Sequence, residues 1–161
     1  MNILILKRAA SLSLILGAIT AIIALVPFFI MYVVLFLSFL CAPAVIIYMK
    51  KKNLLGILDM QQSAVFGGAV GFVTSVGFFA VFIPAVLVIH SIFKNYYAYG
   101  LQYFITFNAL WLFIIILITL AGLLALTNAV TAMGVNAVYM QFEKVPEGVD
   151  EPVDITIDEG I

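Results

Sequence analysis

The chain has very little charge, since only 9% of its residues are Asp, Glu, Lys or Arg, where a soluble domain carries about a quarter. It has a single cysteine, Cys41, and a single histidine, His90, which excludes an internal disulfide and a Cys/His metal cluster. Seven of its eight acidic residues fall in the last nineteen positions, so the long apolar stretches lack the ionisable groups typical of pumps and intramembrane enzymes. We therefore predict no catalytic, cofactor or metal site.

What the chain does have is apolar sequence, with 66% hydrophobic residues and a mean hydropathy of +1.27. The first apolar run covers forty-one uncharged residues between Arg8 and Lys50, about twice the ~20 that one helix needs to cross a bilayer. Pro27 divides this run, which predicts two helices over residues 9–26 and 28–49. Positive charge flanks both ends of the run, so the positive-inside rule places both ends in the cytoplasm.

Two further apolar runs predict helices over residues 64–90 and 103–126. Lys94 and a tyrosine-rich cluster lie between them and suit an outer turn. The polar residues Thr127, Asn128, Thr131 and Asn136 predict that the fourth helix leaves the membrane near Leu126, with a continuation along the interface before Gln141 left open. The predicted fold class is all-α: a four-helix transmembrane domain over residues 1–142, with both termini cytoplasmic, in a cell membrane of the cytoplasmic or bacterial inner type.

Small residues recur at helical spacing in three of the predicted spans. Lipid tails are as apolar as leucine, so membrane helices associate where small residues let their backbones approach. Packing inside one bundle and packing against a second copy or another membrane protein both fit this pattern. The predicted helix-packing residues are Gly17, Gly67, Gly68, Gly71, Ser75, Ala121 and Ala125.

Two prolines, Pro43 and Pro84, lie well inside apolar runs, and each predicts a kink in its helix. A kink frees a backbone carbonyl, which in transporters lines a site and in bundles only bends the helix. Both interpretations are open from the sequence.

Residues 143–161 form an acidic tail with two prolines, which is typical of a solvated, disordered end. Apolar and polar residues alternate within it, as in a strand that adds to the edge of a partner's sheet. The residues that would bind such a partner are Val153, Asp154, Ile155 and Ile157.

The stretch from Cys41-Ala42-Pro43 through Lys50-Lys51-Lys52 to Gly71 resembles small uncharacterised bacterial four-helix integral membrane proteins. The resemblance implies an inner-membrane bundle and adds no catalytic residue. We predict a non-enzymatic structural or accessory subunit whose partners are the lipid bilayer and either itself or another membrane protein, with no nucleic acid. The alternatives are a small oligomeric permease for a neutral or lipophilic solute, and a first hairpin that dips into one leaflet.

Overall fold

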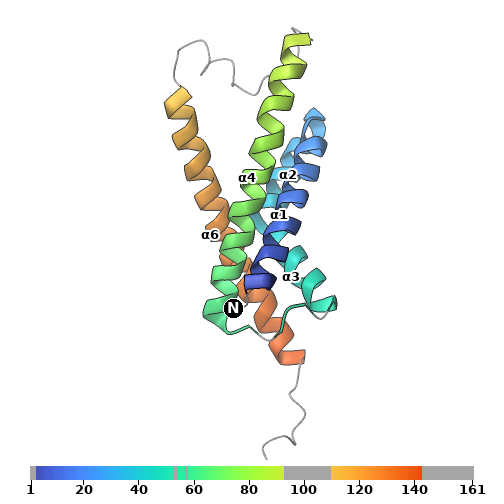
Figure 1. The fold of residues 1–161 in the computed structure, drawn as a ribbon, viewed down its shortest axis with the longest axis vertical. Helices are drawn as coiled ribbons and strands as arrows, with labels where there is room; N and C mark the ends of the chain where they lie inside the picture. Colours follow the sequence, from blue (N-terminus) through green and yellow to red (C-terminus); the bar gives the residue numbers. More distant parts are fainter. Residues whose placement is uncertain (1–2, 53, 57, 93–109, 143–161) are drawn as a thin grey trace, which may run out of the picture.

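The computed structural model describes residues 3–52, 54–56, 58–92 and 110–142. In these residues every regular element is a helix, and Figure 1 shows them gathered into an elongated bundle. The elements are α1 (Ile3–Ala24), the short 3-10 helix η1 (Pro27–Phe29), α2 (Ile30–Phe39), α3 (Cys41–Lys51), α4 (Met60–Ile92) and α6 (Leu110–Phe142).

Three of these helices are long and apolar enough to cross a membrane: Ile5–Ala24, Met60–Ile89 and Trp111–Phe142. The bent pair α2 and α3 makes a fourth if the two count as one span. A helix satisfies its backbone hydrogen bonds internally, which a chain in hydrocarbon must do. Length and composition therefore indicate an all-helical membrane protein.

Helix α4 is the centre of the bundle, because it packs along α1 on one side and along α6 on the other. In Figure 1, α1 and α4 run in the same direction, while α2, α3 and α6 run in the opposite direction. The start of α1 and the end of α6 consequently lie at the same end of the molecule. We call this the basic end, because Lys7, Arg8, Lys50 and Lys51 lie on the helix segments there and Lys52 follows α3 directly. At the other end α4 and α6 diverge.

Helix α1 covers Ile3–Ala24 rather than the predicted residues 9–26, and the helix limits differ from those predicted in three further places. Helix α6 continues unbroken to Phe142, well past the predicted limit of the span near Leu126, and polar residues of its second half face the bundle: Asn128 and Asn136 are both buried. The helix predicted over residues 28–49 is broken at Leu40. Helix α4 is longer than the predicted 64–90 and continues through Pro84.

Candidate functional site

The main irregularity of the bundle is the break at Leu40, where the axes of α2 and α3 differ by 60°. Pro43 explains the position, since its nitrogen has no hydrogen for the Phe39 carbonyl and its ring crowds the preceding turn. Helical hydrogen bonds are present on both sides of the break. Leu40 N donates to Phe36 O at 2.9 Å at the end of α2, and Ala44 N donates to Leu40 O at 2.9 Å at the start of α3. The backbone groups between these two bonds need other partners.

Asn128 of α6 supplies those partners. Its amide nitrogen donates to Leu37 O at 2.7 Å and to Ser38 O at 3.3 Å, and its Oδ1 accepts from Ala42 N at 3.0 Å. Ser38 and Ala42 are the i and i+4 partners of an unbroken helix. The carboxamide of Asn128 thus lies between two groups that would otherwise bond to each other, and it holds the break open.

The polar atoms of Asn128 are fully used by the protein. Its nitrogen, which has two hydrogens, also donates to Leu124 O at 2.8 Å, and its Oδ1 accepts a second bond from the Cys41 thiol at 3.0 Å. The side chain is 0% exposed. This arrangement satisfies a broken helix from a neighbouring helix, as membrane proteins require, and leaves no donor or acceptor of Asn128 for a solute.

Two glycines of α4 make room for Asn128. A Cβ on Gly71 would lie 2.7 Å from Asn128 Cβ, and a Cβ on Gly67 would lie 2.6 Å from Asn128 O. Both are too close for any larger residue. Gly68 is different, because its Cβ would have an ordinary contact of 3.6 Å with Ala125 O.

Of the other predicted packing residues, Ser75 and Ala121 are buried and Ala125 is half-buried. The Ser75 hydroxyl donates to Gly71 O of its own helix at 2.8 Å. Gly17 lies against α4, where a Cβ would come within 2.7 Å of Phe78 N. Gly77 of α4, which was not among the predicted packing residues, lies equally close to α1. A Cβ on Gly77 would lie 2.8 Å from Leu14 O.

A second polar contact lies at the basic end. Asn136 donates from Nδ2 to Leu58 O at 2.7 Å, which ties the segment between α3 and α4 to α6. Its buried Oδ1 has no partner among the residues that the structure describes. Nearby on α6, Ala132 O accepts from the Ser63 hydroxyl at 3.0 Å, and the Lys50 ammonium lies 4.7 Å from the centre of the Tyr139 ring.

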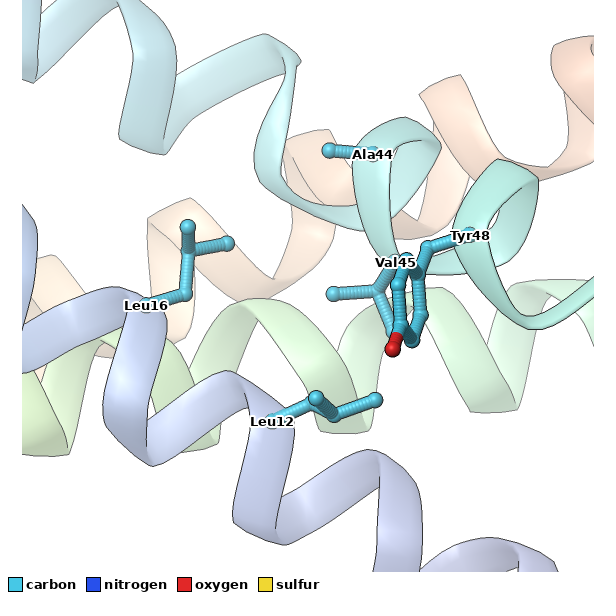
Figure 2. A pocket seen from close by; sticks show the side chains of 5 residues that line it. All are labelled: Leu12, Leu16, Ala44, Val45 and Tyr48. Atoms are coloured by element: carbon cyan, nitrogen blue, oxygen red, sulfur yellow. The ribbon is translucent and has the colours of Figure 1, made fainter. Parts of the chain in front are cut away.

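An apolar groove runs between α1 and the broken helix. Figure 2 shows its first part, a hollow of about 230 Å³ lined by Leu12, Leu16, Ala44, Val45 and Tyr48. A larger hollow of about 580 Å³ continues from Leu16 toward Ile23, between α1 and α2. We call the two together the α1–α3 groove.

The described ranges contain no group of three or more His, Cys, Asp or Glu side chains that would suit a metal ion. The predicted tail residues Val153, Asp154, Ile155 and Ile157 lie outside the described residues. The residues that sequence reasoning misjudged are Asn128 and Asn136. The sequence did contain a signal for both. Their spacing of eight residues puts the two amides about 80° apart around one helix, on the side that also carries the small residues Ala121 and Ala132.

A scan against protein-family models, a search of curated proteins and a search of solved structures each found no match to this chain. The likeness to bacterial four-helix membrane proteins therefore stays a prediction.

Proposed function

We propose that this membrane protein is a non-enzymatic structural or accessory subunit that acts through lateral contacts of its helices. The observation that carries this proposal is the saturation of Asn128: the most polar feature deep in the bundle is fully bonded to the protein's own backbone. The hydroxyls of Ser13, Thr74 and Ser75 likewise bond to carbonyls of their own helices. Such groups fix the register of a bundle, and they offer little to a passing substrate.

A lateral partner has an available surface on the first half of α6. Residues 111–120 expose most of their large apolar side chains, with Trp111 at 65% and Ile118 at 61%. We propose that a second copy or another membrane protein packs here, and that the acidic tail supplies a further contact on the cytoplasmic side. Anionic lipid would repel the tail and keep it accessible to soluble partners.

We propose a topology of four spans, with α2 and α3 together forming one. The two contain 10 and 11 residues, enough for roughly 30 Å of rise before the bend is counted. The basic end then faces the cytoplasm, because six of the seven Lys and Arg residues belong to segments that this topology places there.

The second candidate is a small permease for a neutral or lipophilic solute, which the broken helix favours. Transporter sites commonly form where a discontinuous helix lies near the membrane midplane, and in the proposed four-span topology Leu40 lies about halfway along the span made by α2 and α3. Here the break is filled by a side chain of the protein itself, which makes this the weaker candidate.

Crosslinking and flux distinguish the two. A photoreactive residue at Ile118 should give one crosslinked product of defined mass in native membranes, while the same probe at Phe66, which is 0% exposed, should give none. Deleting residues 147–161 should weaken partner recovery and leave membrane insertion intact, because insertion depends on apolar spans and flanking Lys and Arg. Solute flux through liposomes that Gly71→Leu abolishes, together with no product at Ile118, would favour the permease.

A further inference from the structure

The α1–α3 groove is open at the surface of the bundle, and its lining is almost wholly apolar. Its first hollow is lined by four aliphatic side chains and the ring of Tyr48, and Ala44 contributes only a methyl group to its wall. The 60° bend at Leu40 turns α3 away from the line of α2 (Figure 1). The bend that Asn128 maintains therefore also shapes the groove beside α1.

The groove continues toward positive charge. Arg8 precedes Leu12 by one helical turn, so both lie on the face of α1 that lines the groove. On α3, Lys51 follows Tyr48 by three residues and shares its face. Arg8, Lys51 and the adjacent Lys52 are all exposed, and Asp59 is the only acidic residue in the described ranges.

Tyr48 lines the first hollow and precedes the exposed lysines at the end of α3 by one helical turn. In Figure 2 its hydroxyl oxygen points toward α1 beside Leu12. The side chain is 48% exposed, so the bundle covers Tyr48 only in part. An amphipathic ring of this kind is typical of the level where lipid headgroups meet acyl chains.

We infer that the groove binds an anionic phospholipid of the cytoplasmic leaflet, with one acyl chain in the first hollow and the phosphate held by Arg8, Lys51 and Lys52. The depth agrees: Arg8 to Leu16 is about 12 Å of helix rise, within the ~15 Å that one leaflet contributes to a ~30 Å core. Basic pockets between membrane helices on the cytoplasmic side bind such headgroups. This inference is independent of whether the protein is a subunit or a permease.

The experiment compares phosphatidylglycerol with phosphatidylcholine of identical acyl chains, added to the full-length protein in detergent. Lipid binding is counted by native mass spectrometry, and the thermal midpoint is measured with and without lipid. The wild-type protein should bind phosphatidylglycerol more tightly than phosphatidylcholine, and phosphatidylglycerol should raise its thermal midpoint by more. Equal binding of the two lipids would overturn the inference.

Two variant pairs locate the site. Arg8→Gln should weaken phosphatidylglycerol binding about fivefold, the effect of one basic side chain near an anionic surface, and should leave phosphatidylcholine binding unchanged. Lys7→Gln is the matched control, because Lys7 is exposed and lies about 100° around α1 from Arg8. An equal loss in both variants would show general surface charge and would contradict a site.

The second pair tests the acyl chain. Ala44→Phe fills the first hollow and should abolish the stabilisation by either lipid, whereas Ala80→Phe adds the same ring to an exposed position of α4 outside the groove and should retain it. The midpoint without lipid shows whether each variant is folded. Lipid stabilisation that survives in folded Ala44→Phe would overturn the inference, and if that variant does not fold, the Arg8 and Lys7 pair decides.

Discussion

The two halves of α6 belong to one continuous helix and pack in opposite ways. Over residues 111–120, seven large apolar side chains are more than a third exposed: Trp111, Leu112, Ile114, Ile115, Ile116, Ile118 and Leu120. Over residues 121–136, the helix instead buries a stripe at intervals of three and four residues: Ala121, Leu124, Asn128, Ala132 and Asn136. The first half carries bulky side chains that stay exposed, whereas the buried stripe of the second half is small or polar apart from Leu124.

The comparison shows what decides packing where the solvent is lipid. Apolar burial alone gains an isoleucine little when it leaves lipid for a helix surface that is equally apolar. A partner on residues 111–120 would therefore have to be held by closely matched packing and by contacts elsewhere, such as the tail. Small residues gain more, because close backbones multiply dispersion contacts, and a buried amide must find partners. The second half of α6 offers both, against Gly67 and Gly71 of α4.

The largest expected effect comes from removing the amide that distinguishes the packed half. Asn128→Leu keeps the number and branching of the side-chain heavy atoms but leaves Ala42 N–H and the carbonyls of Leu37 and Ser38 without this partner. At about 1–3 kcal/mol for each unsatisfied buried group, partly relieved by local adjustment, we expect the free energy of unfolding to fall by about 3 kcal/mol. Equilibrium unfolding in mixed detergent micelles measures it.

The control for that substitution lies in the other half of α6. Thr119 is exposed, and its hydroxyl bonds to Ile115 O of the same helix. Thr119→Val should therefore change the unfolding free energy by less than about 0.5 kcal/mol. Equal losses in the two variants would mean that the two halves do not differ in the way described.

The next effect concerns the close approach of α4 and α6. Gly71→Leu forces a side chain into space held by Asn128 and Leu124, which should destabilise the bundle by about 2 kcal/mol. Gly122→Leu on the open side of α6 has nothing within 4 Å of its Cβ and should be neutral or slightly stabilising, since leucine is the better helix former. The same unfolding titration tests both, and a loss in Gly122→Leu would contradict the open face.

A smaller effect is expected from truncating two leucines that lie one turn apart, one on each side of the boundary between the two halves of α6. Leu124 is 8% exposed and Leu120 is 42% exposed. Leu124→Ala should cost about 1 kcal/mol, the cavity part of a core truncation, because the transfer part is nearly absent in lipid. Leu120→Ala should cost less than half as much in the same assay, and the reverse order would contradict the assigned faces.

Composition and charge were enough to predict the helical class and the apolar helices. They were not enough for the length of α6, because Asn128 and Asn136 look alike in sequence whether they face water or a broken helix. The break at Leu40 was also only half predictable: Pro43 indicates a kink, as Pro84 does, yet α4 continues through Pro84. What separates them is the amide opposite Pro43, a contact 86 residues away in sequence.

The smallest expected effect separates burial from bonding. Asn136 is as buried as Asn128, at 1% against 0% exposed, but it makes one strong bond, to Leu58 O, and its Oδ1 has no partner within the described ranges. Asn136→Leu removes that bond and an unsatisfied oxygen together, so we expect a loss of only about 0.6 kcal/mol, the mean for one interhelical bond in a membrane. If Asn136→Leu lowered the free energy of unfolding as much as Asn128→Leu in the same titration, burial of the amide alone would account for the loss. A several-fold difference between them would show that the backbone groups freed at Leu40 make Asn128 the anchor of the fold.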